Sequence, residues 1–298
     1  TLSGRNALYD LGTGSYGGFV GGLYPSGTNV RPTGHEAAGA QMAGDIKPLN
    51  SLGQIDSANG RIGFVAIGMS STKQEFEVFE FDSAVDAFRD PRIVTINGAQ
   101  DGQTAFQWAD PNGAPWSQLA TIVSGKGLTS AQVQVAWIKL TVDGTDVGGW
   151  GSYPPFPSTA SLLHSKLRQV VRNLKLHYPN IRIAYLSSRI YGKYATNGVS
   201  PEPVAYEEGF GVKWLIEDQI NGDATLAYAG SNAAAPLLAW GPYLWADGLG
   251  TDGIAGGIPG RSDGLEYACG DFASDGMNPS ATGRRKVADQ LTAFLNTD

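Results

Sequence analysis

Residues 62–72 read IGFVAIGMSST, an apolar run that ends in glycine and is followed by hydroxyl side chains. The run lacks the apolar–polar alternation of a half-buried strand, which is typical of a parallel strand covered on both faces. The pattern after it predicts a helix over residues 73–88. We therefore expect Ser70 on a strand-to-helix turn, where free backbone N–H groups lie nearby.

Similar apolar runs predict four more strands, at residues 93–96, 133–140, 181–186 and 237–240. Helices are predicted between and after them, at residues 159–177, 206–220 and 281–295. The helix at 159–177 is the clearest, because its leucines and valines recur every three or four residues. Ser280 is the expected N-cap of the last helix. Strands that alternate with helices predict a mainly parallel sheet covered on both sides, with its active site at the carboxyl ends of the strands.

The composition indicates one globular domain. Of the 298 residues, 42% are hydrophobic and 16% are charged, which is enough apolar content for a large core. No Pro/Ser-rich linker divides the chain, so we expect a single domain over residues 1–298, with residues 1–44 as a loop-rich extension. The long segments between predicted elements are candidates for loops that build a binding site.

The formal net charge of −7 argues against nucleic acid or an anionic membrane as partner, because the field would repel phosphates. A neutral or weakly charged small molecule or carbohydrate ester fits better. One cysteine, Cys269, and three histidines give no basis for a disulfide framework or a Cys/His metal site, and no cofactor is expected. The chain has no apolar run of 18 residues. Its start at Thr1 and its glycine-rich loops favour an exported protein, secreted or periplasmic.

Three short blocks could carry chemistry. Ser70 follows the first strand, Gly98 follows the second, and the segment SDGMNPS at residues 274–280 precedes the last helix. Taken singly, each has a plain structural interpretation: a serine there is often a helix N-cap, Gly98 suits a turn, and Asp275 could cap its own turn. Their order along the chain is more informative than any one of them.

In this order the blocks resemble those of the SGNH (GDSL-like) hydrolases, over most of the chain and most strongly from Asp275 to Lys286. The resemblance implies a flavodoxin-like three-layer α/β/α sandwich, no metal, and ester hydrolysis through an acyl-enzyme. It makes Ser70 the nucleophile and Asp275 the residue that orients the base. It also places the N–H groups of Ser70 and Gly98 in the oxyanion hole. An exported bacterial branch is suggested by residues 188–191 and 240–247.

Two departures from this family pattern matter. Asn278 occupies the position of the catalytic histidine, and an amide cannot accept a proton from serine, so the general base is missing. The strand at 133–140 is not followed by the asparagine that normally supplies an oxyanion-hole side chain. Lys139 could be a cationic substitute there, or a strand-end lysine that reaches solvent.

Other residues could line the site. His35 lies in an N-terminal segment that could fold over it, and Arg189 lies in one of the segments similar to exported proteins of the superfamily. Trp240, Tyr243 and Trp245 are either flat faces for a sugar or packed loop anchors. We expect His35, Lys139, Arg189 and Trp245 to contribute to substrate binding.

Three hypotheses follow. In the first, the framework is that of an active carboxylesterase or carbohydrate deacetylase, and Asn278 is an inactivating change that leaves it inactive or strongly impaired. In the second, Asn278 is natural and the protein is a pseudoenzyme that binds a glycan or another ligand. In the third, Lys139 or His35 activates Ser70. The first is preferred, because a decayed site has no reason to keep an aspartate whose task is to orient a histidine.

Overall fold

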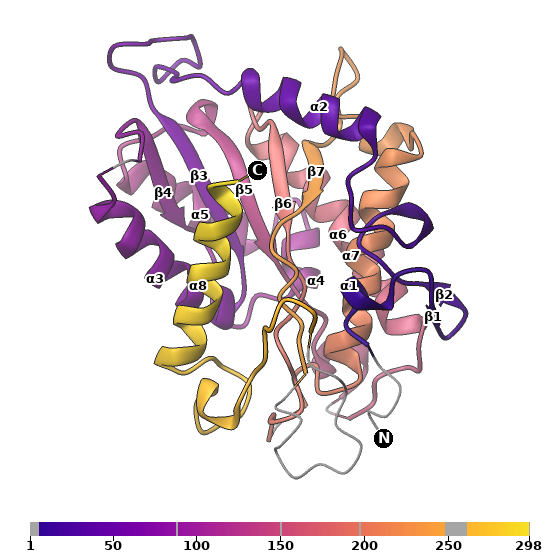
Figure 1. Cartoon of the computed structure of the whole chain (residues 1–298). Helices are drawn as coiled ribbons and strands as arrows, with labels where there is room; N and C mark the ends of the chain where they lie inside the picture. Colours follow the sequence, from indigo (N-terminus) through magenta and orange to yellow (C-terminus); the bar gives the residue numbers. More distant parts are fainter. Residues whose placement is uncertain (1–5, 88, 150, 197, 248–260, 298) are drawn as a thin grey trace.

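The computed structural model describes residues 6–87, 89–149, 151–196, 198–247 and 261–297. Residues 1–5 of the predicted N-terminal extension, and position 88, where one helix was expected to end, lie outside the described residues. So does part of the long segment after residue 247. Within the described residues the chain is an α/β protein with helices on both faces of a central sheet (Figure 1).

The five strands of the central sheet are β3 (Ile62–Gly68), β4 (Ile93–Asn97), β5 (Val133–Lys139), β6 (Ile183–Leu186) and β7 (Leu237–Trp240). Their order is β4-β3-β5-β6-β7, and every adjacent pair is parallel. Counted along the chain this is the 2-1-3-4-5 order of flavodoxin-like folds. The predicted three-layer fold class is confirmed, and each predicted strand agrees with the observed one to within two residues.

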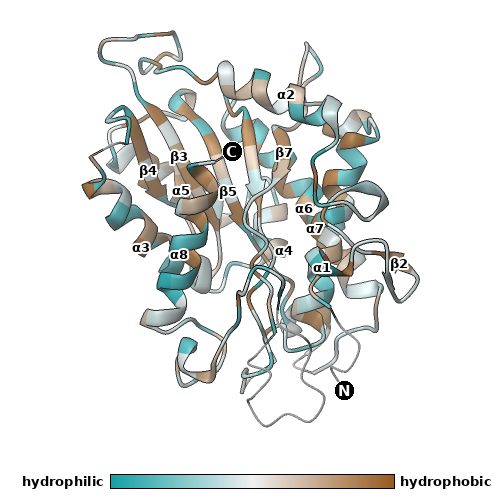
Figure 2. Ribbon diagram, in the orientation of Figure 1, coloured by the Kyte–Doolittle hydropathy of each residue, from teal (hydrophilic) through white to brown (hydrophobic). Residues whose placement is uncertain are grey.

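Burial explains why these strands carry apolar runs. Every residue of β3, β6 and β7 is buried, so neither face offers a place for a polar side chain. Figure 2 shows the hydrophobic residues concentrated in the strands. The amphipathic α6 adds Leu163, Leu167 and Leu174 to the same core.

The long helices are α3 (Ser70–Val85), α6 (Ser158–His177), α7 (Val204–Ile220) and α8 (Ala281–Leu295). α3 packs beside α8, and α6 packs beside α7. Right-handed crossovers place α3 on one face of the sheet and α6 and α7 on the other. Ser280 caps α8 as expected, its hydroxyl accepting a hydrogen bond from the N–H of Gly283 at 3.4 Å.

The remaining regular elements are short, apart from two helices of 12 residues. They are α1 (Leu8–Leu11), β1 (Ser15–Tyr16), β2 (Phe19–Val20), α2 (Thr33–Gly44), α4 (Ala105–Ala109), α5 (Ala114–Gly125) and the 3-10 turns η1 (Pro25–Gly27), η2 (Ser130–Gln132), η3 (Gly144–Val147), η4 (Ala224–Leu226) and η5 (Cys269–Asp271). None of the described helices is both long and apolar enough to cross a membrane.

The N-terminal region is more regular than expected. Residues 33–44, predicted as loop, form α2, which packs against β6 and β7 (Figure 1). Its sequence is rich in alanine and glycine, and only His35, Gly39 and Met42 are buried. An apolar stripe of this kind is too thin to predict a helix from its periodicity.

Candidate functional site

The candidate site lies at the carboxyl edge of the sheet, at the point where the strand order reverses. β3 is the first strand of the central sheet along the chain, with β4 on one side of it and β5 on the other. A crevice opens at such a switch point in doubly wound sheets. Ser70 begins α3 directly after β3, and its side chain is partly exposed. The residue therefore lies where this fold class binds ligands.

Ser70, Asn278 and Asp275 form a continuous hydrogen-bonded relay. The Ser70 hydroxyl donates to Oδ1 of Asn278 at 3.0 Å, and Nδ2 of Asn278 donates to Oδ2 of Asp275 at 2.7 Å. A carboxylate only accepts hydrogen bonds, so the amide nitrogen must face Asp275 and the amide oxygen must face Ser70. This is the order of contacts found in a serine–base–acid triad, with an amide where the imidazole would be.

The turn that carries Asp275 and Asn278 is tightly constrained. Oδ1 of Asp275 accepts the backbone N–H groups of Met277 and Asn278, both at 2.9 Å. Gly276 has a φ of +64°, and a Cβ placed on it would come within 1.6 Å of the carbonyl oxygen of Tyr194. Only glycine meets both conditions, since it tolerates the left-handed region and occupies no space there.

The Asp275 carboxylate is held in its ionised form. Burial raises the pKa of Asp275, but the hydrogen bonds from Met277 and from the backbone and side chain of Asn278 outweigh that effect, so the pKa lies below its ordinary value. A fixed negative charge therefore lies one residue beyond the group that contacts Ser70. In a triad, that charge orients the base and stabilises it once it is protonated.

Gly98 directly follows β4, which lies beside β3 in the sheet, and its position is explained by close packing. A Cβ there would come within 2.8 Å of the carbonyl oxygen of Ala66 and 2.3 Å of Cδ1 of Leu119. Its own carbonyl accepts a hydrogen bond from the side chain of Gln100 at 3.2 Å. The absent side chain is thus required for β4 to end against β3, whatever the Gly98 N–H contributes to catalysis.

Lys139 is buried and paired, which neither interpretation of the sequence anticipated. Its Nζ donates to both carboxylate oxygens of Glu75, at 2.7 and 2.6 Å, and lies 3.4 Å from the hydroxyl of Ser71. The two side chains are 1% and 0% exposed, so Lys139 does not reach solvent. Burial lowers the pKa of Lys139 and raises that of Glu75, against their mutual attraction.

Glu75 was missed in the sequence, although a signal was present. It lies on the buried face of α3 together with Phe76 and Phe79. A carboxylate on the apolar face of a helix needs a partner, because an unpaired buried charge is costly. The nearest lysine at a strand end, Lys139, was a reasonable candidate for that partner.

A second buried acid, Glu208, lies under the neighbouring loops. Its carboxylate accepts the N–H of Val142 at 2.8 Å and contacts the hydroxyl of Thr141, which also contacts Ser200. Burial raises the pKa of Glu208 to about 7, against the effect of these hydrogen bonds. The loop after β5 is therefore fixed to the start of α7 by an acid that is only partly ionised at neutral pH.

Arg189 lies in the loop after β6, at the same edge of the sheet, and is 4% exposed. Its charge acts on Glu75 and Lys139 on one side and on Glu208 on the other. The structure thus places Arg189 among the buried charges of the carboxyl edge, near the residues that follow β3 and β5.

Two expected site residues lie elsewhere. His35 is on α2, and its Nε2 contacts the carbonyl oxygen of Leu238 at 2.7 Å. Leu238 is in register with Val65 three strands away, about 14 Å at normal strand spacing, and well before the carboxyl end. The prediction that His35 lines the site is therefore wrong, because the segment folds as a helix on β6 and β7.

Trp245 is a packed anchor and presents no face to a ligand. It is 1% exposed, its Nε1 donates to Glu202 at 2.8 Å, and its ring packs edge-on against Tyr206. Trp240 and Tyr243 are also buried. The prediction that Trp245 binds substrate is therefore corrected.

None of the three histidines contacts Ser70. His164 contacts Asp218 at 2.6 Å, and His177 contacts the carbonyl oxygen of Pro111 and stacks on Trp116. With His35 bound to β7, all three histidines of the chain have partners away from Ser70. Among the described residues, no cluster of His, Cys, Asp and Glu side chains could hold a metal ion.

Comparisons with known proteins give distant likenesses only. No family model matches the sequence, and no curated protein matches it. The solved structures that resemble this one include the YxiM protein of Bacillus subtilis, at 10% identity and a TM-score of 0.42, over 82% of this chain and 58% of that one. Another is BT4096, described as a gut microbial diltiazem-metabolizing enzyme, at 14% identity and a TM-score of 0.44, over 79% and 47%.

A third is a Bacteroides fragilis protein provisionally assigned as an acylhydrolase, at 13% identity and a TM-score of 0.40, over 90% of this chain and 99% of that one. The chain spans about half the length of the first two proteins. What these proteins act on is a property of theirs, and the function of this chain has to be argued from its own site.

Proposed function

We propose that the chain has the framework of an SGNH-type serine ester hydrolase, of the carboxylesterase or carbohydrate deacetylase kind, with Ser70 as the nucleophile that would form the acyl-enzyme. The observation that carries the proposal is the relay from Ser70 through Asn278 to an ionised Asp275. Its location at the switch point of the sheet supports the same interpretation. The proposed substrate is a small-molecule or carbohydrate ester, and the proposed setting is outside the cytoplasm.

Asn278 leaves this framework without a base. The amide holds the Ser70 hydroxyl in place but cannot take its proton, so the chain should bind substrate far better than it turns it over. Losing the base of a serine triad costs roughly 10⁶-fold in turnover in subtilisin. Oxyanion-hole and binding effects alone leave about 10³ to 10⁴ over water.

The decisive experiment is Asn278→His. An imidazole at this position could donate to Asp275 from Nδ1 and accept the Ser70 proton at Nε2, using the contacts that the amide makes now. We expect kcat/KM for 4-nitrophenyl acetate to rise by at least about 10³-fold. The measurement is the release of 4-nitrophenolate by the wild-type and Asn278→His proteins at equal concentration.

Two controls make the result specific. Asn278→Gln keeps an amide and should gain nothing. Ser70→Ala combined with Asn278→His should return to the background rate. A histidine variant that is folded and shows no Ser70-dependent gain would falsify the proposal.

A second function is favoured by one observation: the Asn278 amide accepts from Ser70 and donates to Asp275, so both ends of its side chain are engaged without a histidine. In that case the protein binds a glycan or another ligand without turning it over. A glycan array that yields a millimolar or tighter ligand, together with an inactive histidine variant, would favour this alternative.

A further inference from the structure

Arg189 is a buried arginine for which the described residues supply no hydrogen-bond or ion-pair partner. The side chain belongs to a residue that is 4% exposed, and its Nε is enclosed with no hydrogen-bond acceptor. No hydrogen bond or ion pair within the described part of the chain engages its guanidinium group. Arginine stays charged in proteins and carries five N–H donors, so buried arginines are normally paired.

The neighbouring acids do not neutralise this cation. Glu75 is bound by Lys139 through both oxygens, and that pair has no net charge whichever of the two holds the proton. Glu208 directs its oxygens to Val142 and Thr141, and its pKa of about 7 leaves it largely protonated below neutral pH. Neither of these two carboxylates therefore takes up the N–H donors of Arg189.

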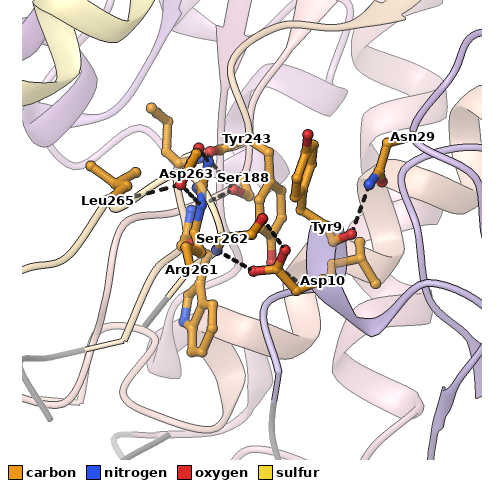
Figure 3. A network of polar contacts seen from close by, with 12 residues as sticks. Tyr9, Asp10, Asn29, Ser188, Tyr243, Arg261, Ser262, Asp263 and Leu265 are labelled. Carbon is orange, nitrogen blue, oxygen red and sulfur yellow. Dashed lines mark hydrogen bonds and ion pairs between the residues drawn. The ribbon is translucent and has the colours of Figure 1, made fainter. Parts of the chain in front are cut away.

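The backbone around Arg189 is held by hydrogen bonds of the two preceding serines. The hydroxyl of Ser187 accepts the indole N–H of Trp137 at 2.9 Å. The hydroxyl of Ser188 accepts the backbone N–H groups of Leu244 and Trp245, at 2.9 and 3.0 Å. Figure 3 shows Ser188 next to Tyr243 and Arg261, and the bonds from Arg261 to the carbonyl oxygens of Tyr243 and Trp245 tie the loop after β7 to residues 261–265. The backbone that carries Arg189 is therefore held in place before a ligand binds, which lowers the entropy lost on binding.

We propose that Arg189 binds a carboxylate of the ligand, and that the substrate of the Ser70 site is therefore an ester of a molecule that carries an acid group, such as an acidic sugar. The substrate part of this inference rests on the proposed function. One unpaired charge calls for one anion, and the planar guanidinium fork matches a carboxylate in a bidentate geometry. Phosphate could use the same fork and is separated by the experiment.

The first test measures binding alone, in the chain with Asn278. Sodium benzoate at roughly 30 times its Kd should raise the Tm by about 3 °C, while benzamide, its neutral analogue, should not. Arg189→Gln should abolish the shift. Arg182→Gln is the matched control, since Arg182 lies at the amino end of the same strand with a buried Nε that also lacks a partner, and it should keep the shift.

The outcomes are separable. Equal shifts in the wild-type and Arg189→Gln chains, or no shift in the wild type, would show that Arg189 binds no carboxylate. If phenyl phosphate produced the same shift at a tenfold lower concentration than benzoate, the anion would be a phosphate and the carboxylate assignment would be wrong. Loss of the shift in Arg189→Gln alone supports the assignment.

The second test links the anion to the reaction. In the Asn278→His chain, 4-acetoxybenzoate should be cleaved with a kcat/KM at least tenfold above that for 4-acetoxybenzamide, after correction for their rates with hydroxide. Arg189→Gln should bring the ratio of the two kcat/KM values close to one. If Asn278→His is inactive on both esters, the proposed function fails, while the benzoate shift still decides the anion site. Equal kcat/KM values for the two esters in the Asn278→His chain would contradict the proposal that the substrate carries an acid group.

Discussion

At the scale of single residues, the Glu75–Lys139 pair determines how the carboxyl edge is held together. Both side chains are enclosed, and Lys139 sits against Ser71, next to the proposed nucleophile. Removing one member of a buried pair leaves an uncompensated charge, which costs roughly 3–5 kcal/mol. Replacing both by apolar residues of similar size is often neutral or stabilising.

We therefore predict that Glu75→Gln or Lys139→Met alone lowers the free energy of unfolding by about 3 kcal/mol, whereas Glu75→Leu with Lys139→Met restores most of it. Urea denaturation of the four proteins measures the effect. Additive losses in the double variant would contradict the prediction and would mean that Lys139 is stabilised by some other contact.

Glu208 makes the stability depend on pH. Its pKa rises from about 4.5 in the unfolded chain to about 7 in the folded one, because burial disfavours the charged form. A raised acid pKa contributes stability that is fully present below about pH 4.5 and is lost as the pH rises through 7. The shift corresponds to about 3 kcal/mol of unfolding free energy.

We expect Glu208→Gln to remove this dependence, since a neutral amide can still accept the N–H of Val142 and donate to Thr141. The difference in unfolding free energy between the variant and the wild type should grow in favour of the variant from pH 5 to pH 8. Urea denaturation at a series of pH values tests it. A constant difference would show that Glu208 is ionised throughout the range.

At the scale of elements, the turn before α8 depends on Gly276. Alanine there would be strained by the φ of +64° and would meet the Tyr194 carbonyl. We predict that Gly276→Ala costs about 2 kcal/mol or more of stability. Gly264 is a matched control, with a φ of +79° but nothing within 4 Å of a Cβ. Its alanine variant should cost only about 1 kcal/mol. Equal losses in denaturation experiments would argue against the packing of the turn on Tyr194.

The burial of an element determined how well the sequence predicted it. β3, β6 and β7 are buried throughout, so an apolar run marks them directly. α6 and α8 have clear amphipathic patterns, and their predicted bounds agree with the observed ones to within one residue. α2 and α5 were not predicted as helices. α2 is made largely of small residues, and α5 has a proline in its first turn.

The site was predictable only where chain order fixes position. Ser70 and the turn at 275–278 both lie at the carboxyl edge in this topology, so their proximity follows from the fold. The burial of Trp245 does not follow in the same way, because it depends on how loops after β6 and β7 pack on each other. Such loops have no periodic pattern, and contacts between them are not encoded locally.

At the scale of the whole molecule, the acidic net charge and the buried cations of the carboxyl edge act on anions over different distances. The chain carries a net charge of −7, yet Lys139 and Arg189 are enclosed together beneath this edge. The overall field repels anions, whereas the local cation attracts them at short range. Discrimination among ligands should therefore come from contact with the edge and not from long-range steering.

A chain that binds without turnover should be stabilised by its substrate for as long as the ester is present. A ligand at 100 times its Kd adds about 2.7 kcal/mol to the unfolding free energy, which is a shift of several degrees in Tm for a domain of this size. We predict that an ester substrate shifts the Tm of the Asn278 chain and that the shift persists over hours of incubation. In the Asn278→His chain the same shift should decay as the ester is hydrolysed. Repeated thermal scans, with product measured in parallel, test both statements. A shift that decays equally in the Asn278 chain and depends on Ser70 would show that Ser70 is activated by a group other than a residue at position 278.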